Sequence, residues 1–107
     1  MKRIVATAVV SLSLGAFAQA DPEFKLVIEN HKFTPDRVEV PAGKKVKLTI
    51  ENKDATPEEF ESKQLNREKV IPGKSTGIVY VGPLKPGEYS FVGEFNEATA
   101  KGVIVAK

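Results

Sequence analysis

Hydrophobic and polar residues alternate along most of the chain after residue 20, and this alternation is the period of half-buried β-strands. The clearest case is segment 45–50, where three aliphatic residues alternate with two lysines and a threonine. No segment after residue 20 carries a helical period long enough to predict a helix. The predicted strands are 24–29, 37–40, 45–50, 59–62, 69–71, 77–81, 88–93 and 102–106.

Turn residues separate these segments. Pro41-Ala42-Gly43, Pro72-Gly73 and Pro86-Gly87 combine the fixed φ of proline with the positive φ that glycine allows. Seven or eight short strands divided by such turns predict an all-β fold, a β-sandwich of mostly antiparallel strands. A chain this small needs a well-packed centre, which we expect to be aromatic. The candidates for it are Phe33, Phe60, Tyr80, Tyr89 and Phe91.

The first 20 residues are typical of a secretory signal peptide. A basic start at Lys2 and Arg3 precedes an apolar run over 4–17, and Ala18-Gln19-Ala20 matches the small-x-small cleavage pattern. The run is short for a membrane anchor, and no cysteine follows it that could carry a lipid. We therefore expect one soluble domain over 21–107, exported to a bacterial periplasm.

Composition narrows the chemistry further. The chain has no cysteine and a single histidine, which excludes a disulfide framework, a zinc–thiolate cluster and a thiol nucleophile, and disfavours a serine–histidine triad. The formal net charge of +2 comes from 16 basic and 14 acidic residues, and two of the basic ones lie in the predicted signal peptide. The exported domain is then nearly neutral, so nucleic-acid binding is not expected.

Three stretches of the exported part resemble the cupredoxin family. Residues 33–52 carry Phe-Thr-Pro, Val-Glu-Val-Pro-Ala-Gly and Val-Lys-Leu-Thr-Ile-Glu-Asn in the order of its N-terminal half. Residues 52–60 resemble the loop that delivers the first copper histidine, and 84–91 resemble the strand that ends in the copper cysteine. The resemblance implies that the β-sandwich has a Greek-key, cupredoxin-like topology.

The copper ligands of that family are missing. A type-1 site uses two imidazoles, a thiolate and usually a weak axial methionine. Here the first histidine position is Glu58 and the cysteine position is Gly93. The second histidine position falls near Asn96 or Glu97, and the axial position falls near Ala100. Type-1 copper electron transfer is therefore not expected.

The residues present instead resemble one cupredoxin-like branch. Residues 57–61 (Pro-Glu-Glu-Phe-Glu) and 67–73 (Arg-Glu-Lys-Val-Ile-Pro-Gly) are similar to small periplasmic FtrB-type proteins and to the N-terminal domain of EfeO-type proteins. Residues 93–96 and 99–102 fit the FtrB-type members best. This resemblance implies an accessory role in ferrous-iron uptake, with a high-affinity iron permease and a periplasmic iron- or copper-binding protein as partners.

If this resemblance holds, the metal ligands would be an imidazole and several carboxylates. Such a set favours Fe(III), Cu(II) or Mn(II) over Cu(I), so an iron or Cu(II) ion is the expected cofactor. Glu58 and Glu59 should face opposite sides of a regular strand, and Arg67 is expected to pair with a carboxylate at the mouth of the sandwich. The candidate metal ligands are His31, Glu58, Glu59, Glu94 and Glu97.

Other readings of these residues stay open. A lone histidine is more often structural, and charged loops are more often only solvated. One alternative is a metal-free module that docks onto a periplasmic transport complex. Another is a copper ferroxidase, which a single histidine disfavours, so we expect no enzyme beyond an auxiliary role in Fe(II) oxidation. Whether the chain forms a homodimer is left open by the sequence.

Overall fold

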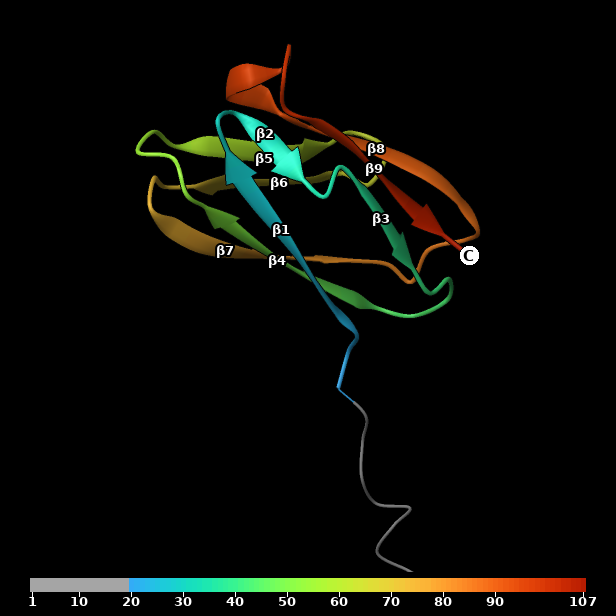
Figure 1. Cartoon of the computed structure of the whole chain (residues 1–107). Helices are drawn as coiled ribbons and strands as arrows, with labels where there is room; N and C mark the ends of the chain where they lie inside the picture. The colour runs from blue at the N-terminus through green and yellow to red at the C-terminus, as the bar shows by residue number, and fades with distance from the viewer. Residues whose placement is uncertain (1–19) are drawn as a thin grey trace, which may run out of the picture.

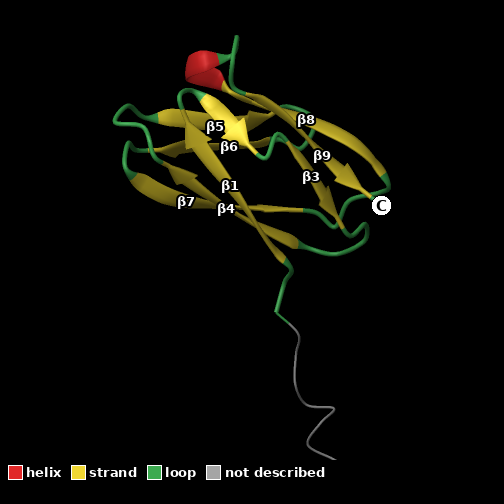
Figure 2. Ribbon diagram, viewed as in Figure 1, coloured by secondary structure: helices red, strands yellow, loops and turns green. Residues whose placement is uncertain are grey.

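The computed structural model describes residues 20–107, so the predicted signal peptide lies outside the described residues except for Ala20. The described part is built of strands and one short 3-10 turn, stacked as two layers (Figures 1 and 2). No helix in these residues is long and apolar enough to cross a membrane. The elements are β1 Glu23–Glu29, β2 Lys32–Thr34, β3 Arg37–Val40, β4 Val46–Asn52, β5 Glu58–Ser62, β6 Arg67–Ile71, β7 Ser75–Val81, β8 Gly87–Gly93, η2 Glu94–Asn96 and β9 Lys101–Ala106.

The strands form a four-stranded sheet in the order β2-β1-β4-β7 and a five-stranded sheet in the order β3-β9-β8-β5-β6. Two pairs, β1 with β4 and β3 with β9, run parallel, and the other neighbours run antiparallel. The prediction of an all-β sandwich with mostly antiparallel strands is confirmed. The described residues contain nine strands rather than seven or eight.

The unpredicted strand is β2. Its three residues are too few to display a two-residue alternation. It pairs with β1 through a two-residue turn at Asn30 and His31, whose φ angles are 56° and 58°. Positive φ at both central residues is the geometry of a type I′ hairpin turn, and asparagine tolerates it well. This turn fixes the position of His31 at one end of the sandwich.

Three phenylalanines form the centre of the core, as the sequence predicts. The Phe33 ring lies 4.9 Å from Phe91 and 6.3 Å from Phe60, and both contacts are edge-to-face. The two tyrosines do not join them fully. Tyr89 is partly buried against the core, but Tyr80 is 42% exposed, which corrects that prediction. On β7 the residues Val79 and Val81 face inward, so the alternation places Tyr80 outside.

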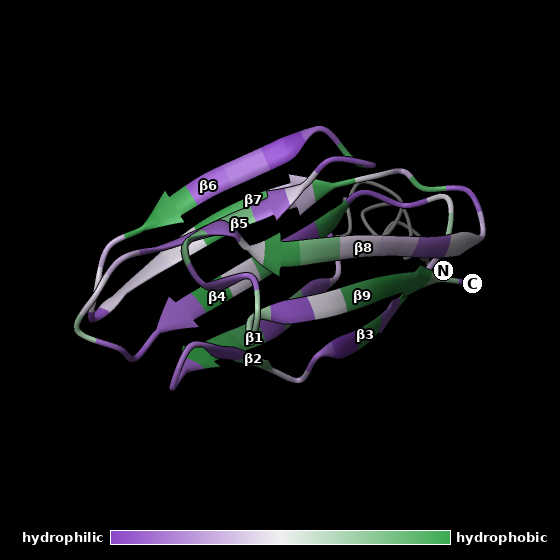
Figure 3. Ribbon diagram, turned by 90° about the horizontal axis from the view of Figure 1, so that it is seen from above, coloured by the Kyte–Doolittle hydropathy of each residue, from purple (hydrophilic) through white to green (hydrophobic). Residues whose placement is uncertain are grey.

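The edge strands β6 and β7 belong to different sheets and lie next to each other. Most of β6 is hydrophilic, and it appears mainly purple in Figure 3. Its first residue, Arg67, donates from Nε to the carbonyl oxygen of Tyr80 at 2.9 Å and from a terminal nitrogen to the carbonyl of Asn66. The expected pairing of Arg67 with a mouth carboxylate is therefore wrong, because the guanidinium bridges the two sheets instead.

Candidate functional site

Glu58 opens β5 and is the one acidic residue buried within residues 20–107, with 1% of its surface exposed. Its carboxylate accepts three hydrogen bonds. The backbone N–H of Glu59 and that of Phe95 donate to Oε1 at 3.0 and 2.9 Å, and the side-chain amide of Asn96 donates to Oε2 at 2.7 Å. Burying a carboxylate is costly unless donors of this kind surround it. The three bonds therefore explain how Glu58 lies inside.

Gly93 makes the space that this carboxylate fills. A Cβ at Gly93 would lie 2.7 Å from the Cδ of Glu58 and 2.7 Å from the Cβ of Ala100. The surrounding loop is fixed by its backbone, since Gly93 N–H donates to the carbonyl of Ala100 and Ala100 N–H donates to that of Asn96. At the family's cysteine position, Glu58 thus leaves no room for a side chain, and the residue there is glycine.

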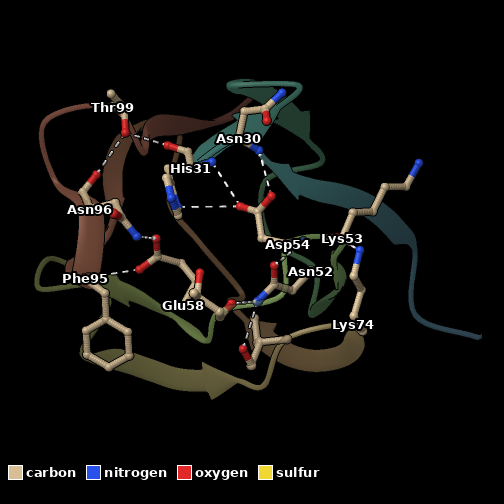
Figure 4. A network of polar contacts seen from close by, with 12 residues as sticks. Asn30, His31, Asn52, Lys53, Asp54, Glu58, Lys74, Phe95, Asn96 and Thr99 are labelled. Carbon is tan, nitrogen blue, oxygen red and sulfur yellow. Dashed lines mark hydrogen bonds and ion pairs between the residues drawn. The ribbon is translucent and has the colours of Figure 1, made fainter.

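A chain of polar contacts leads from Glu58 to the rim of the sandwich (Figure 4). Thr99 contacts the carbonyl of Asn96 at 3.4 Å, and its hydroxyl donates to the carbonyl of His31 at 2.6 Å. The His31 Nδ1 atom lies 3.6 Å from a carboxylate oxygen of Asp54. His31 is therefore placed at the predicted mouth, on the turn between β1 and β2, with its imidazole half exposed.

Asp54 holds the turn that carries His31. Its two carboxylate oxygens accept the backbone N–H groups of Asn30 and His31 at 2.8 and 3.0 Å. The N–H of His31 is the main cause that lowers the pKa of Asp54 below its ordinary value. Desolvation opposes this effect, while the N–H of Asn30 and the charges of His31 and Lys74 add to it.

Asn52, the last residue of β4, is buried behind Asp54. Its side-chain nitrogen donates to the carbonyls of Thr56 at 2.9 Å and Ile71 at 3.1 Å, and lies 3.4 Å from that of Pro72. Its side-chain oxygen accepts the N–H of Asp54 at 3.0 Å. Asn52 thereby joins the loop before β5 to the end of β6 and positions the carboxylate of Asp54.

The remaining predicted ligands lie on the other side of β5. Glu59 and Glu61 alternate with the buried residues of that strand and are only partly covered. A side-chain hydrogen bond with Glu59 is the main cause that raises the pKa of Glu94, helped by desolvation and by the negative charges of Glu59 and Glu97, whereas a hydrogen bond with Glu61 opposes it. We call Glu59, Glu61, Glu94 and Glu97 the outer acidic group.

The structure therefore divides the predicted metal ligands. Glu58 and His31 belong to the polar chain at the mouth, whereas Glu59, Glu94 and Glu97 belong to the outer acidic group. Glu58 and Glu59 face opposite sides of β5, as expected. Within residues 20–107, no three histidine, cysteine, aspartate or glutamate side chains are arranged to hold a metal ion. The ligand set as a whole stays a prediction.

A type-1 copper ion does not fit the donors at the family's ligand positions. Gly93 has no side chain, and Ala100 offers only a methyl group. The oxygens of Glu58 already accept three N–H groups, and the amide nitrogen of Asn96 points at Oε2. These donors direct hydrogen atoms toward the centre, and an N–H group cannot ligate a cation.

The sequence does not single out Asn52, Asp54 and Thr99, whose hydrogen bonds fix the loops around His31 at this end of the sandwich. In the sequence, Asn52-Lys53-Asp54 is only part of a loop that resembles the cupredoxin pattern. A weak signal exists in this tripeptide, because asparagine and aspartate after a strand often bond to nearby backbone. Thr99 has no comparable signal, since it acts through His31, which is 68 residues away in sequence.

Two stacked mixed sheets with a loop-bounded site at one end define a class of small β-sandwich proteins. The family model of the cupredoxin-like domain matches residues 2–106, and the chain belongs to this family. The uncharacterized protein RP394 of Rickettsia prowazekii (strain Madrid E) is 49% identical over 84 residues, which are 78% of this chain and 66% of that protein. The match thus spans slightly less than two thirds of the relative.

Solved structures show the same fold. A copper binding protein in its apo form has a TM-score of 0.71 at 17% identity, with 84% of this chain and 93% of that chain covered. Auracyanin A, a "blue" copper protein of Chloroflexus aurantiacus, has a TM-score of 0.67 at 14% identity, with 82% of this chain and 100% of that chain covered. At such identities the likeness is one of fold.

Proposed function

We propose that this protein is an exported cupredoxin-fold module that acts by binding a protein partner and holds no metal at the family's copper position. The observation that carries the proposal is the buried carboxylate of Glu58, which takes up that position and accepts three N–H groups. N–H donors already take three of the roughly four lone-pair sites of this carboxylate, so the centre needs no cation to be stable. The function then lies on the surface around the mouth.

Phe95 supports a contact role for that surface. It is 51% exposed although it is a large apolar residue, and its ring points away from the polar network in Figure 4. Its backbone N–H is held by Glu58, so the ring is presented from a fixed loop. A rigid aromatic side chain costs little entropy to bury and is a common anchor in protein interfaces.

The partner that we propose belongs to a metal-uptake system. The similarity of segments 57–61 and 67–73 to FtrB-type and EfeO-type proteins supports a high-affinity iron permease, or the periplasmic metal-binding protein that serves it. The signal-like first 20 residues support a periplasmic location. In this role the module assists ferrous-iron uptake without itself being an enzyme.

A second candidate function is metal binding at the mouth. It is favoured by the half-exposed imidazole of His31, which lies 3.6 Å from Asp54, and by the copper proteins among the structural neighbours. Imidazole and carboxylate ligands would suit Cu(II) or an iron ion. In this case the protein would be a metal-binding accessory of iron uptake, with His31 and nearby glutamates as its ligands.

Calorimetric titration separates the two functions. The purified protein is titrated with Cu(II), with Mn(II) and, without oxygen, with Fe(II), in parallel with His31→Ala and Glu58→Gln. The module predicts no one-to-one binding of any of these metals. One-to-one binding that is lost in His31→Ala would overturn the module in favour of the second candidate.

The partner contact is tested by a photo-crosslinking amino acid placed at Phe95 in cells of the native organism. The matched control carries it at Lys25, which is exposed on β1 in the other sheet. We expect a discrete adduct with a membrane permease or a periplasmic metal-binding protein at position 95 and none at position 25. Equal labelling at both positions would contradict a specific contact at Phe95.

A further inference from the structure

The donors around Glu58 share one chemical property, which is that all three are neutral N–H groups. Two are backbone amides, of Glu59 and Phe95, and the third is the side-chain amide of Asn96. In residues 20–107, no lysine, arginine or histidine forms an ion pair with this carboxylate. The negative charge of Glu58 is therefore stabilised by oriented dipoles alone, which is how proteins bind small oxyanions.

These donors come from separate parts of the chain. Glu59 lies on β5, and Phe95 and Asn96 lie on η2 after β8. The backbone around them is fixed independently, because Asn96 also accepts the N–H of Ala100 at 2.8 Å and Gly93 donates to Ala100 at 2.9 Å. The donors thus form a preorganised cradle, which we call the anion cradle and define by the N–H groups of Glu59, Phe95 and Asn96.

We propose that the centre which corresponds to the copper position is, in this protein, an oxyanion-binding site with the carboxylate of Glu58 as its internal ligand. The polarity of the centre is then opposite to that of a metal site, since hydrogen atoms rather than lone pairs point into it. The ligand class is a small monovalent carboxylate. This inference goes beyond the proposed function, because it concerns what the centre binds and holds whatever the protein's partner is.

The geometry gives this proposal a direct test. Truncation of Glu58 to alanine removes Cγ, Cδ and both carboxylate oxygens, and these atoms have the size and connectivity of an acetate ion. The cradle would keep its donors, because none of them belongs to the side chain that is removed. Gly93 would keep the space open, since it has no side chain to fill the centre.

Thermal unfolding of Glu58→Ala is compared in sodium acetate and in sodium chloride of equal ionic strength. We expect a lower Tm than that of the unmutated protein in chloride, and a rise of about 8 °C in acetate at ten times its Kd. Acetamide, which is neutral and of similar shape, should give no such rise. The unmutated protein and Glu61→Ala, a matched change three residues along β5, should not respond to acetate.

Three results would overturn the anion cradle. Equal rescue by acetamide would mean that only a cavity is filled. Equal rescue of Glu61→Ala would mean that acetate acts on the whole surface. Stabilisation of Glu58→Ala by Cu(II) instead of acetate would mean that the centre binds cations. None of these results depends on a partner protein, so they are separate from a failure of the proposed module.

Glu58→Gln keeps the proposal testable if the alanine variant does not fold. It preserves volume but replaces a carboxylate oxygen by an amide nitrogen, which places a donor in a centre made of donors. The remaining oxygen can still accept the N–H groups of Glu59 and Phe95, whereas the new amide nitrogen opposes that of Asn96. We therefore expect Glu58→Gln to have a lower Tm than the unmutated protein and the control Glu61→Gln to leave the Tm unchanged. An unchanged Tm in Glu58→Gln would contradict the proposal.

Discussion

Glu58 and Glu59 are adjacent on β5, yet the two carboxylates lie in opposite environments. Glu58 faces inward, is almost fully buried and accepts three N–H groups. Glu59 faces outward, where its neighbours are other glutamates and its presence raises the pKa of Glu94. One side of the strand stabilises a negative charge with donors, and the other side crowds negative charges together.

The difference shows that residue type alone does not identify a metal site. On sequence, Glu58, Glu59, Glu94 and Glu97 were one set of candidate ligands. In the fold, the alternation of β5 turns Glu58 inward, where it accepts the N–H of Phe95, and turns Glu59 outward, where it meets Glu94. We call the polar contacts that link Glu58, Asn96, Thr99, His31, Asp54 and Asn52 the inner network. The inner network and the outer acidic group should therefore respond differently to mutation.

The largest effect should come from the space that Gly93 leaves. Gly93→Ala places a Cβ within 2.7 Å of both the Glu58 carboxyl carbon and Ala100, so we expect a loss of about 3 kcal/mol in the free energy of unfolding. Chemical denaturation measures this value. Glu94→Ala, one residue further on, serves as the control. If Gly93→Ala were as stable as the unmutated protein, this result would contradict the close packing of Glu58 against Gly93.

Asn52 tests the inner network away from Glu58. Asn52→Ala removes the donor for the carbonyls of Thr56 and Ile71 and the acceptor for the N–H of Asp54, which leaves buried polar groups unpaired. We expect a loss of about 2 kcal/mol in the free energy of unfolding. Lys53→Ala, an exposed neighbour, should cost less than about 0.5 kcal/mol. Equal losses in both variants would contradict the buried role of Asn52.

Asp54 gives the inner network a pH dependence. Its pKa is lowered in the folded state, so its contribution to stability is complete above the ordinary pKa of about 4 and decreases as the pH falls through the lower folded value. Asp54→Asn should be less stable than the unmutated protein by about 1 kcal/mol at pH 7, and this difference should narrow below about pH 4. Urea unfolding from pH 7 to pH 2 measures it, and a constant difference would contradict the assignment.

The smallest effect should come from the outer acidic group and have the opposite sign. The pKa of Glu94 is raised in the folded state, so its favourable contribution is complete below the ordinary glutamate pKa and is lost as the pH rises through the folded value. Glu94→Gln should slightly raise the Tm at pH 7 and leave it unchanged at pH 3. Glu39→Gln gives no gain, because Glu39 lies 3.1 Å from Lys107 Nζ. A lower Tm for Glu94→Gln would refute like-charge crowding.

Much of the fold could be predicted from the sequence, because alternation and turn residues are local signals. They located eight of the strands, and the inward positions Val79 and Val81 follow from the same alternation. The prediction for Tyr80 was wrong because this aromatic residue lies between two inward-facing valines and so faces outward. The strand β2 was missed because three residues after a tight turn carry no readable period.

Less of the candidate site could be predicted, because it is made by contacts between distant segments. The resemblance to the cupredoxins placed Glu58 and Gly93 at two of that family's ligand positions, and Asn96 or Glu97 near a third. Nothing in that resemblance says that the side chain of one fills the space of another, or that Asn96 donates to Glu58 across 38 residues. Hydrogen-bond direction is a property of the folded loops, and it decides between a cation site and an anion cradle.

The contact between Arg67 and Tyr80 bears on what an edge strand of this sandwich offers to other molecules. A free edge strand offers unpaired carbonyl groups, and these can template the addition of a strand from another molecule. On β7 the guanidinium of Arg67 already occupies the carbonyl of Tyr80, and the charged strand β6 lies beside it. The bridge therefore does more than join the two sheets, since it leaves one carbonyl fewer on this edge for a strand from another molecule.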